Sequence, residues 1–186
     1  MIEVSAETIE RVEALLAGVP KGAERALSNA MNRGLSKMKT GAAKKVREVY
    51  TVQSSAINEA TDTRIQKAST GNLAGHIHFS GYKIPLYKFK VTPKAPGIKK
   101  QVKAAVKKGG GTAFENAFIA QMKSGHIGVF ERETSKRFPI EEKMGLAMAQ
   151  MVGNLNVMTK LEKEAQKTVD ERIAHEIDRL LNGYGG

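Results

Sequence analysis

The sequence predicts an α+β fold in which N-terminal helices and a C-terminal helix pack on an antiparallel sheet of about five strands. Two periodicities predict it. Apolar residues recur every three or four positions up to about residue 62 and again after about residue 145, whereas they alternate between those limits. Because helical and strand-like stretches are segregated along the chain, an antiparallel sheet is favoured over alternating βαβ units.

The chain has 186 residues, a length that suits one domain. With 41% hydrophobic and 26% charged residues, its composition excludes a wholly disordered or fibrous protein. We expect a single domain built from N-terminal helices (residues 1–62), a sheet with basic loops (63–145) and C-terminal helices (146–182).

Three helices are expected in the first 62 residues. Ser5 can cap a helix whose apolar stripe includes Val12 and Leu16, and Gly18-Val19-Pro20 ends it. Pro20 suits the first turn of a second helix, expected over residues 20–50. Thr51 is expected to cap a third and weaker helix over residues 52–60.

Alternation of apolar and polar residues places strands in the middle of the chain. The expected strands cover residues 73–80, 84–91, 102–107, 114–122 and 125–133, with a further extended stretch from Phe138. Segments 92–101 and 107–113 are expected to be basic loops that become ordered on a partner.

The last part of the chain is predicted to be helical. A short Met-rich helix is expected over residues 146–152, and Asn154 opens the final helix. Met144, Met148 and Met151 suit either the core or a partner contact, because methionine side chains adapt to both.

The net charge of +11 is concentrated in the centre of the chain. Residues 1–62 and 115–186 are nearly neutral, whereas residues 63–114 hold eleven Lys or Arg and no Asp or Glu. The centre must therefore face something anionic, or lie where self-repulsion is tolerable. The residues proposed to contact a partner or a polyanion are Lys94, Lys99, Lys100, Lys103, Lys107 and Lys108.

A nucleic acid is one anionic partner that these lysines could bind, through phosphate contacts. Tyr82, Tyr87 and Phe89 could stack on single-stranded bases, although Tyr87 and Phe89 also suit the buried face of a strand. Arg64 is the only arginine in the basic segment, which disfavours base-specific recognition in the major groove. A basic nucleic-acid-binding protein is therefore the alternative function.

No residue pattern predicts catalysis, a cofactor or a metal. The chain has no cysteine and no phosphate-binding or dinucleotide-binding motif. His76 and His78 share a strand face but lack a nearby third ligand, so a solvated polar face is the better interpretation. Glu131, Glu133, Glu141 and Glu142 could supply an acid–base pair, but neighbouring Lys and Arg residues favour local ion pairs.

Several segments together resemble the minor tail protein Z family of long-tailed phages and prophages, and the wider group of tail-completion and neck proteins. These segments are Ala30-Met31-Asn32-Arg33, Lys45 to Tyr50, Ile84 to Phe89, Ala117 to Arg132 and Arg137-Phe138-Pro139-Ile140. The likeness covers roughly residues 20–150 and rests on the order and spacing of the segments. The central region is lysine-rich here, where arginine is usual in the family.

The resemblance implies a non-enzymatic protein of virion morphogenesis, acting at the head-proximal end of the tail in productive head–tail joining. It implies that Phe118, Phe130 and Ile140 fill the core of the sheet and that Gly125 and Gly128 allow a tight hairpin. Pro139 belongs to the same motif, and Arg132 and Arg137 would form an ion pair or an intersubunit contact.

The same resemblance implies the partners and the location. Copies of the chain would form a ring, for which related neck proteins suggest six, against tail-tube, terminator or head-connector proteins. Non-specific DNA contact is a further expectation, and no membrane contact is expected, because no apolar stretch reaches the length of a membrane span. The protein would be assembled in the bacterial host cytoplasm and remain in the virion tail.

Overall fold

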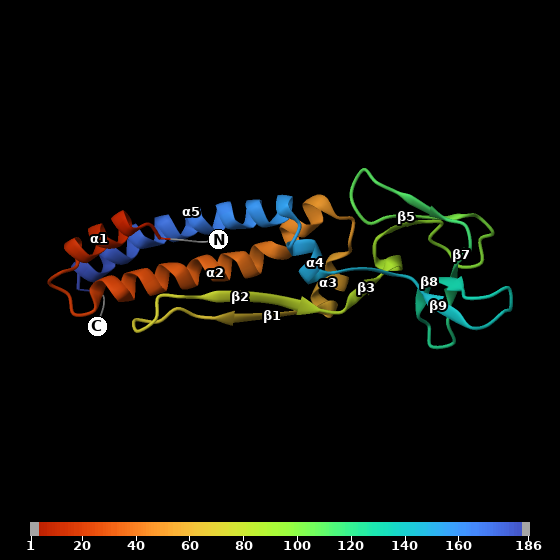
Figure 1. Ribbon diagram of the computed structural model, residues 1–186, viewed down its shortest axis with the longest axis horizontal. Helices are drawn as coiled ribbons and strands as arrows, with labels where there is room; N and C mark the ends of the chain where they lie inside the picture. The colour runs from red at the N-terminus through yellow and green to blue at the C-terminus, as the bar shows by residue number, and fades with distance from the viewer. Residues whose placement is uncertain (1–3, 184–186) are drawn as a thin grey trace. The chain divides into compact units, whose positions relative to one another are not determined.

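A computed structural model describes residues 4–183 and confirms the α+β class (Figure 1). The described residues form five α-helices: α1 (Ala6–Leu15), α2 (Gly22–Val49), α3 (Ser54–Ala60), α4 (Met148–Val152) and α5 (Leu155–Leu181). The strands are β1 (Thr61–Gln66), β2 (His76–Gly81), β3 (Lys83–Pro85), β4 (Lys90–Thr92), β5 (Val102–Ala105), β6 (Thr112–Phe114), β7 (Ala117–Gln121), β8 (Ile127–Arg132), β9 (Ile140–Glu142) and β10 (Met144–Ala147).

The strands form four small sheets rather than the single sheet of about five strands that was expected. Their orders are β1-β2, β10-β3, β4-β5-β6 and β7-β8-β9. The last three sheets are antiparallel throughout. The antiparallel arrangement was thus predicted correctly, but the number of strands was underestimated.

Two helix caps follow directly from the sequence. The hydroxyl oxygen of Ser5 accepts a hydrogen bond from the backbone N–H of Thr8 at 3.2 Å, at the start of α1. The side-chain oxygen of Asn154 accepts one from the backbone N–H of Asn156 at 3.1 Å, at the start of α5. Each bond satisfies an N–H group that has no partner within its helix.

Thr51 does not cap α3, which begins two residues later than predicted. The Thr51 hydroxyl instead donates to the Ala105 carbonyl at 2.5 Å and accepts from the Lys90 N–H at 3.0 Å. The residue therefore fastens the α2–α3 connection to β4 and β5.

The strand expected over residues 84–91 is interrupted by a 3-10 turn, Leu86–Lys88. Leu86 and Phe89 are both buried, and residues three apart point the same way in a 3-10 turn but to opposite faces in a strand. Burial of this apolar pair therefore favours the turn. Leu146 departs from prediction as well, because it lies in β10, which pairs with β3, and α4 begins only at Met148.

Contacts between residues divide the described chain into two compact units. Unit 1 contains residues 4–42, Thr63–His78 and residues 158–183, and unit 2 contains Ala43–Asp62 and Phe79–Val157.

The core of unit 1 is formed by α1, α2 and α5. Its buried members are Val12, Leu16, Ala26, Leu27, Ala30, Val169, Ile173 and Leu180. The carboxamide of Asn32 on α2 donates to the Ala68 carbonyl at 2.9 Å and accepts from the Ala68 N–H at 2.8 Å, which holds the β1–β2 connection on the helix.

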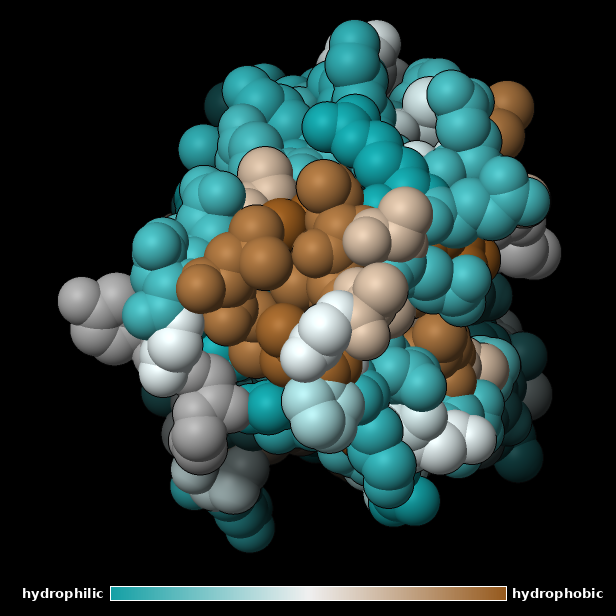
Figure 2. Space-filling model, turned by 90° about the vertical axis from the view of Figure 1, so that its left-hand side faces the viewer, coloured by the Kyte–Doolittle hydropathy of each residue, from teal (hydrophilic) through white to brown (hydrophobic). Residues whose placement is uncertain are grey.

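The apolar core of unit 1 continues to the surface where α1 and α5 end. Leu15 at the end of α1 is 46% exposed, and Leu181 at the end of α5 is 55% exposed. Val19, which follows α1, is partly buried against the core. Figure 2 shows apolar side chains gathered on this end of the unit.

The core of unit 2 combines residues from α3, α4 and the small sheets. Its largest fully buried side chains include Ile57, Ile84, Phe89, Val102, Met148 and Met151. Met148 and Met151 therefore take the core role, whereas Met144 is 44% exposed.

Candidate interaction surface

The six lysines predicted to contact a partner all belong to unit 2 and are all exposed. We call them the lysine surface: Lys94, Lys99, Lys100, Lys103, Lys107 and Lys108. Among residues 4–183, no carboxylate lies within 4.0 Å of any of their ammonium groups. Their charges are therefore not neutralised within the described chain.

The register of the β4-β5-β6 sheet fixes where Lys103 points. Val102 and Ala104 are buried, so Lys103 between them faces outward, opposite Thr92 on β4 and Ala113 on β6. Lys90 is exposed on the same outward face, in the diagonal position. The sheet thus has one apolar face and one basic face.

The remaining lysines lie in the segments that enter and leave β5. Lys94, Lys99 and Lys100 belong to the β4–β5 connection, where the Tyr87 hydroxyl donates to the Lys94 carbonyl at 3.2 Å. The turn at Lys107 and Lys108 is fastened to the end of α2, because the Lys108 N–H donates to the Val49 carbonyl at 2.9 Å. The second basic loop therefore has backbone partners of its own.

The aromatic residues considered for base stacking are not all available. Phe89 is only 1% exposed and belongs to the core, whereas Tyr82 is 85% exposed. Stacking platforms need exposed ring faces. The basic face therefore suits contact with charged groups better than contact with bases.

The β7–β8 hairpin contains most of the residues that carry the family resemblance. Phe118 and Phe130 face each other in register, with ring centroids 6.2 Å apart. Phe130 is 6% exposed, whereas Phe118 and Ile140 are only half-buried. The hairpin turn contains Gly125, whose φ of +85° suits glycine.

Close packing also explains the glycine at position 128. A β-carbon on Gly128 would lie 2.5 Å from the Oε1 atom of Glu142 and 2.9 Å from the Cζ atom of Phe130, closer than packed atoms approach. The same ring lies edge-on to the imidazole of His126, with centroids 6.3 Å apart. Phe130 therefore fills the space beside Gly128.

Arg132 and Arg137, for which an ion pair or an intersubunit contact was predicted, lie beside aromatic rings. The guanidinium carbon of Arg132 is 4.5 Å from the centroid of Phe118, and that of Arg137 is 5.5 Å from the centroid of Phe138. Pro139 follows a cis peptide bond, just before β9 begins. No ion pair of either arginine is present among residues 4–183.

The glutamates considered for acid–base chemistry form local contacts. Lys143 pairs with Glu131 and lies 3.8 Å from Glu141, and the hydrogen bond to Glu131 raises the pKa of Lys143. Glu142 lies 2.8 Å from His126. His76 and His78 are exposed on β2, and no three His, Asp or Glu side chains in residues 4–183 converge as metal ligands would.

Comparison with known proteins decides the family. Residues 7–184 match the family described as prophage minor tail protein Z (GPZ). The chain belongs to this family. No curated protein and no solved structure matches it.

Membership of the minor tail protein Z family confirms the resemblance and extends it. The match covers the final helix α5, which lay outside the segments that carried the resemblance. The family is one of structural proteins of the prophage tail. No helix within residues 4–183 is both long and apolar enough to cross a membrane.

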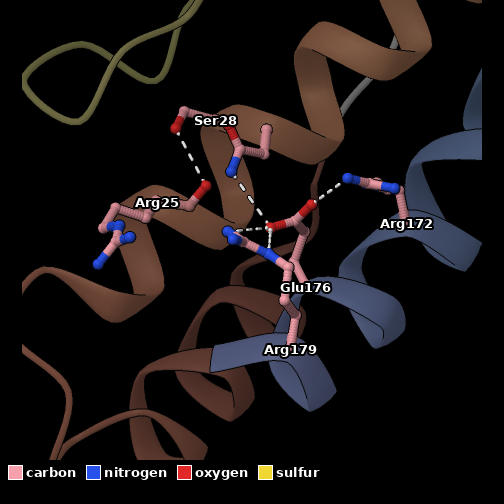
Figure 3. Close-up of polar contacts among 6 residues, drawn as sticks. Arg25, Ser28, Arg172, Glu176 and Arg179 are labelled. Carbon is pink, nitrogen blue, oxygen red and sulfur yellow. Dashed lines mark hydrogen bonds and ion pairs between the residues drawn. The ribbon is translucent and has the colours of Figure 1, made fainter. Parts of the chain in front are cut away.

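One charged cluster in unit 1 was not predicted. Glu176 on α5 is 1% exposed, yet it is charged, and Figure 3 shows Arg172 and Arg179 directed toward its carboxylate. The Arg172 Nη2–Oε1 distance is 2.5 Å, the Arg179 Nη2–Oε2 distance is 2.8 Å, and Asn29 on α2 donates to Oε2 at 3.2 Å.

The environment keeps Glu176 ionised. Burial by itself would raise the pKa of Glu176, but hydrogen bonds from Asn29 and Arg179 and the charges of both arginines lower it below its ordinary value. Arg172 lies four residues before Glu176 and Arg179 three residues after it, spacings from which the sequence predicts ion pairs along a helix. Burial, which distinguishes this cluster from a surface pair, depends on how α2 packs on α5.

Proposed function

We propose that this member of the minor tail protein Z family completes the head-proximal end of the tail and is required for head and tail to join productively. The observation that carries the proposal is the family match over nearly the whole chain. The protein acts by shape and surface in the virion, and performs no reaction.

The lysine surface supports a docking role within that function. Six exposed lysines without acidic neighbours repel one another and gain by approaching an anionic surface. We propose that they contact an acidic rim of the tail-tube, terminator or head-connector proteins, and that copies of the chain form a ring there. Complementary charge of this kind sets the register and speed of docking more than the affinity.

Particles made without the protein test the proposal. Tails of normal length should form but fail to yield infectious particles, which electron microscopy and plaque assays would show. Supplying the wild-type chain should restore infectivity. Particles that infect normally without the protein would contradict the proposed function.

Replacement of the lysine surface tests the docking step. A variant with all six lysines changed to Glu should leave tails that do not join heads, whereas a control with Lys39, Lys44 and Lys123 changed to Glu should support joining. Tight, sequence-dependent binding of duplex DNA at physiological ionic strength would instead favour the nucleic-acid alternative.

A further inference from the structure

Unit 1 has a polar groove between α2 and α5. Two adjoining hollows of ≈550 Å³ and ≈440 Å³ lie along these helices, and both are lined by Arg33, Ser36 and Arg172. Because both hollows are lined by these residues, they lie next to each other along the two helices, and we call them together the α2–α5 groove.

The α2–α5 groove is positively charged. Arg33, Lys37 and Lys67 line it, are exposed, and have no acidic partner among residues 4–183. Of the acids in its wall, Glu171 is exposed and lies 3.7 Å from Lys167, and Glu176 is held by two arginines. An excess of positive charge therefore remains for a ligand.

The sequence of α2 explains this excess. Between Glu24 and Glu48 the helix contains seven Lys or Arg residues and no acid: Arg25, Arg33, Lys37, Lys39, Lys44, Lys45 and Arg47. Residues 1–62 are nearly neutral because their acids lie outside this stretch, three of them in α1.

The acids of α1 form a complementary face. Glu7, Glu10 and Glu13 recur every three residues, are exposed, and have no partner among residues 4–183. They lie away from Val12 and Leu16, which fix α1 on the core. From Glu7 to Glu13 the helix rises about 9 Å, so the three carboxylates form a short acidic row along α1.

We propose that the α2–α5 groove of one copy of the chain binds the Glu7, Glu10 and Glu13 carboxylates of a second copy. Three unpaired cations and three unpaired carboxylates of opposite charge then meet. Of the rings on which a base could stack, the lining of the groove holds a single imidazole, that of His175, and no Phe, Tyr or Trp. A carboxylate-bearing helix is therefore a better occupant than a nucleic acid.

The contact joins two different surfaces, so each copy retains a free groove and a free α1 face. Repetition of such a heterologous contact produces a ring if the rotation closes. The inference rests on the proposed function only for the expectation that copies assemble in the tail. It adds which surfaces meet.

Charge exchange in the full-length chain tests the contact. One variant carries Arg33→Glu, Lys37→Glu and Lys67→Glu, and the other carries Glu7→Lys, Glu10→Lys and Glu13→Lys. Sedimentation velocity at about 0.01 M ionic strength, where the Debye length is about 30 Å, should show wild-type self-association. Each variant alone should self-associate at least about tenfold more weakly than the wild type, because charges of the same sign then face each other across the contact.

An equimolar mixture of the two variants is the decisive measurement. The negative groove of one variant matches the positive α1 face of the other, and the reverse holds too, so the mixture should associate as the wild type does. The matched control, Lys39→Glu with Lys44→Glu and Lys123→Glu, should associate like the wild type. Circular dichroism should show that all variants are folded.

Two results would overturn the proposal: a wild type that stays monomeric under these conditions, or a mixture that associates no better than its components. Particle assembly separates this failure from that of the proposed function. If the groove variant fails to self-associate but restores infectivity, the contact is refuted and the tail function stands. If particles infect normally without the protein, the tail function is refuted.

Discussion

A buried charge cluster in unit 1 and an exposed one in unit 2 play opposite parts. In unit 1 the carboxylate of Glu176 is buried and held by Arg172 and Arg179 of the same helix, α5, and by Asn29 of α2. In unit 2 the six lysines of the lysine surface are exposed and have no carboxylate within 4.0 Å in the described chain. One set of charges is satisfied inside the fold, and the other remains available to a partner.

A buried charge and an exposed charge contribute to the protein in different ways. A buried ion costs several kcal/mol to desolvate, so it persists only where its partners are in place. An exposed lysine changes the free energy of unfolding little, so its removal has a large effect only where a partner binds it. The Glu176 cluster of unit 1 and the lysine surface of unit 2 therefore predict opposite outcomes for charge removal, in stability for the cluster and in assembly for the lysine surface.

The largest expected effect comes from stripping the cations from Glu176. Arg172→Ala combined with Arg179→Ala leaves a buried carboxylate without its charge partners, which should lower the free energy of unfolding by about 3–5 kcal/mol. Urea denaturation followed by circular dichroism measures the change. Lys167→Ala, which breaks the exposed Lys167–Glu171 pair, should change it by less than about 0.5 kcal/mol.

A third substitution shows whether the unpaired charge causes the loss. Adding Glu176→Leu to the doubly substituted chain removes the buried carboxylate, so most of the lost stability should return. If the triple variant is no more stable than the double variant, the arginines act through packing rather than charge.

A smaller effect on the free energy of unfolding is expected from two threonines of unit 2, because their hydroxyl groups are uncharged. Thr51→Val removes a donor to Ala105 and an acceptor for Lys90, and should cost about 1–3 kcal/mol. Thr61 has a buried hydroxyl without a hydrogen-bond partner in the described residues, so Thr61→Val should stabilise the protein by about 1 kcal/mol.

Replacement of Thr by Val is thus expected to destabilise the protein at position 51 and to stabilise it at position 61. The urea midpoints of the two variants measure both effects. Thr92→Val is the control, because Thr92 is exposed on β4 and its hydroxyl forms no hydrogen bond with residues 4–183. If both buried-site variants lose stability equally, the presence of a hydrogen-bond partner does not decide the effect.

Local chemistry explains what the sequence predicted well. The caps at Ser5 and Asn154 depend on a side chain and an N–H two or three residues away, so both were predictable. Lys103 was predictable as an exposed strand residue because its neighbours Val102 and Ala104 are apolar.

Tertiary packing decided what the sequence did not predict. The turn at Leu86–Lys88 forms because Leu86 and Phe89 are buried together, and the inner side of β1 includes Thr61 and Thr63 instead of a row of apolar residues. The α2–α5 groove was missed for a similar reason, since Lys67 joins Arg33 and Lys37 only in the folded unit.

The smallest effect on stability is expected at the lysine surface, and it is the sharpest test of the difference between the units. Changing all six lysines to Ala should alter the free energy of unfolding by less than about 0.5 kcal/mol per residue, because none has an acidic partner in the described chain. Like-charge repulsion among them is relieved as well, so the net change should be near zero or slightly stabilising. The same variant should fail to support head–tail joining in particles that otherwise lack the protein. A large loss of stability would show that these lysines hold the fold of unit 2, and would remove the contrast with Glu176 on which their docking role depends.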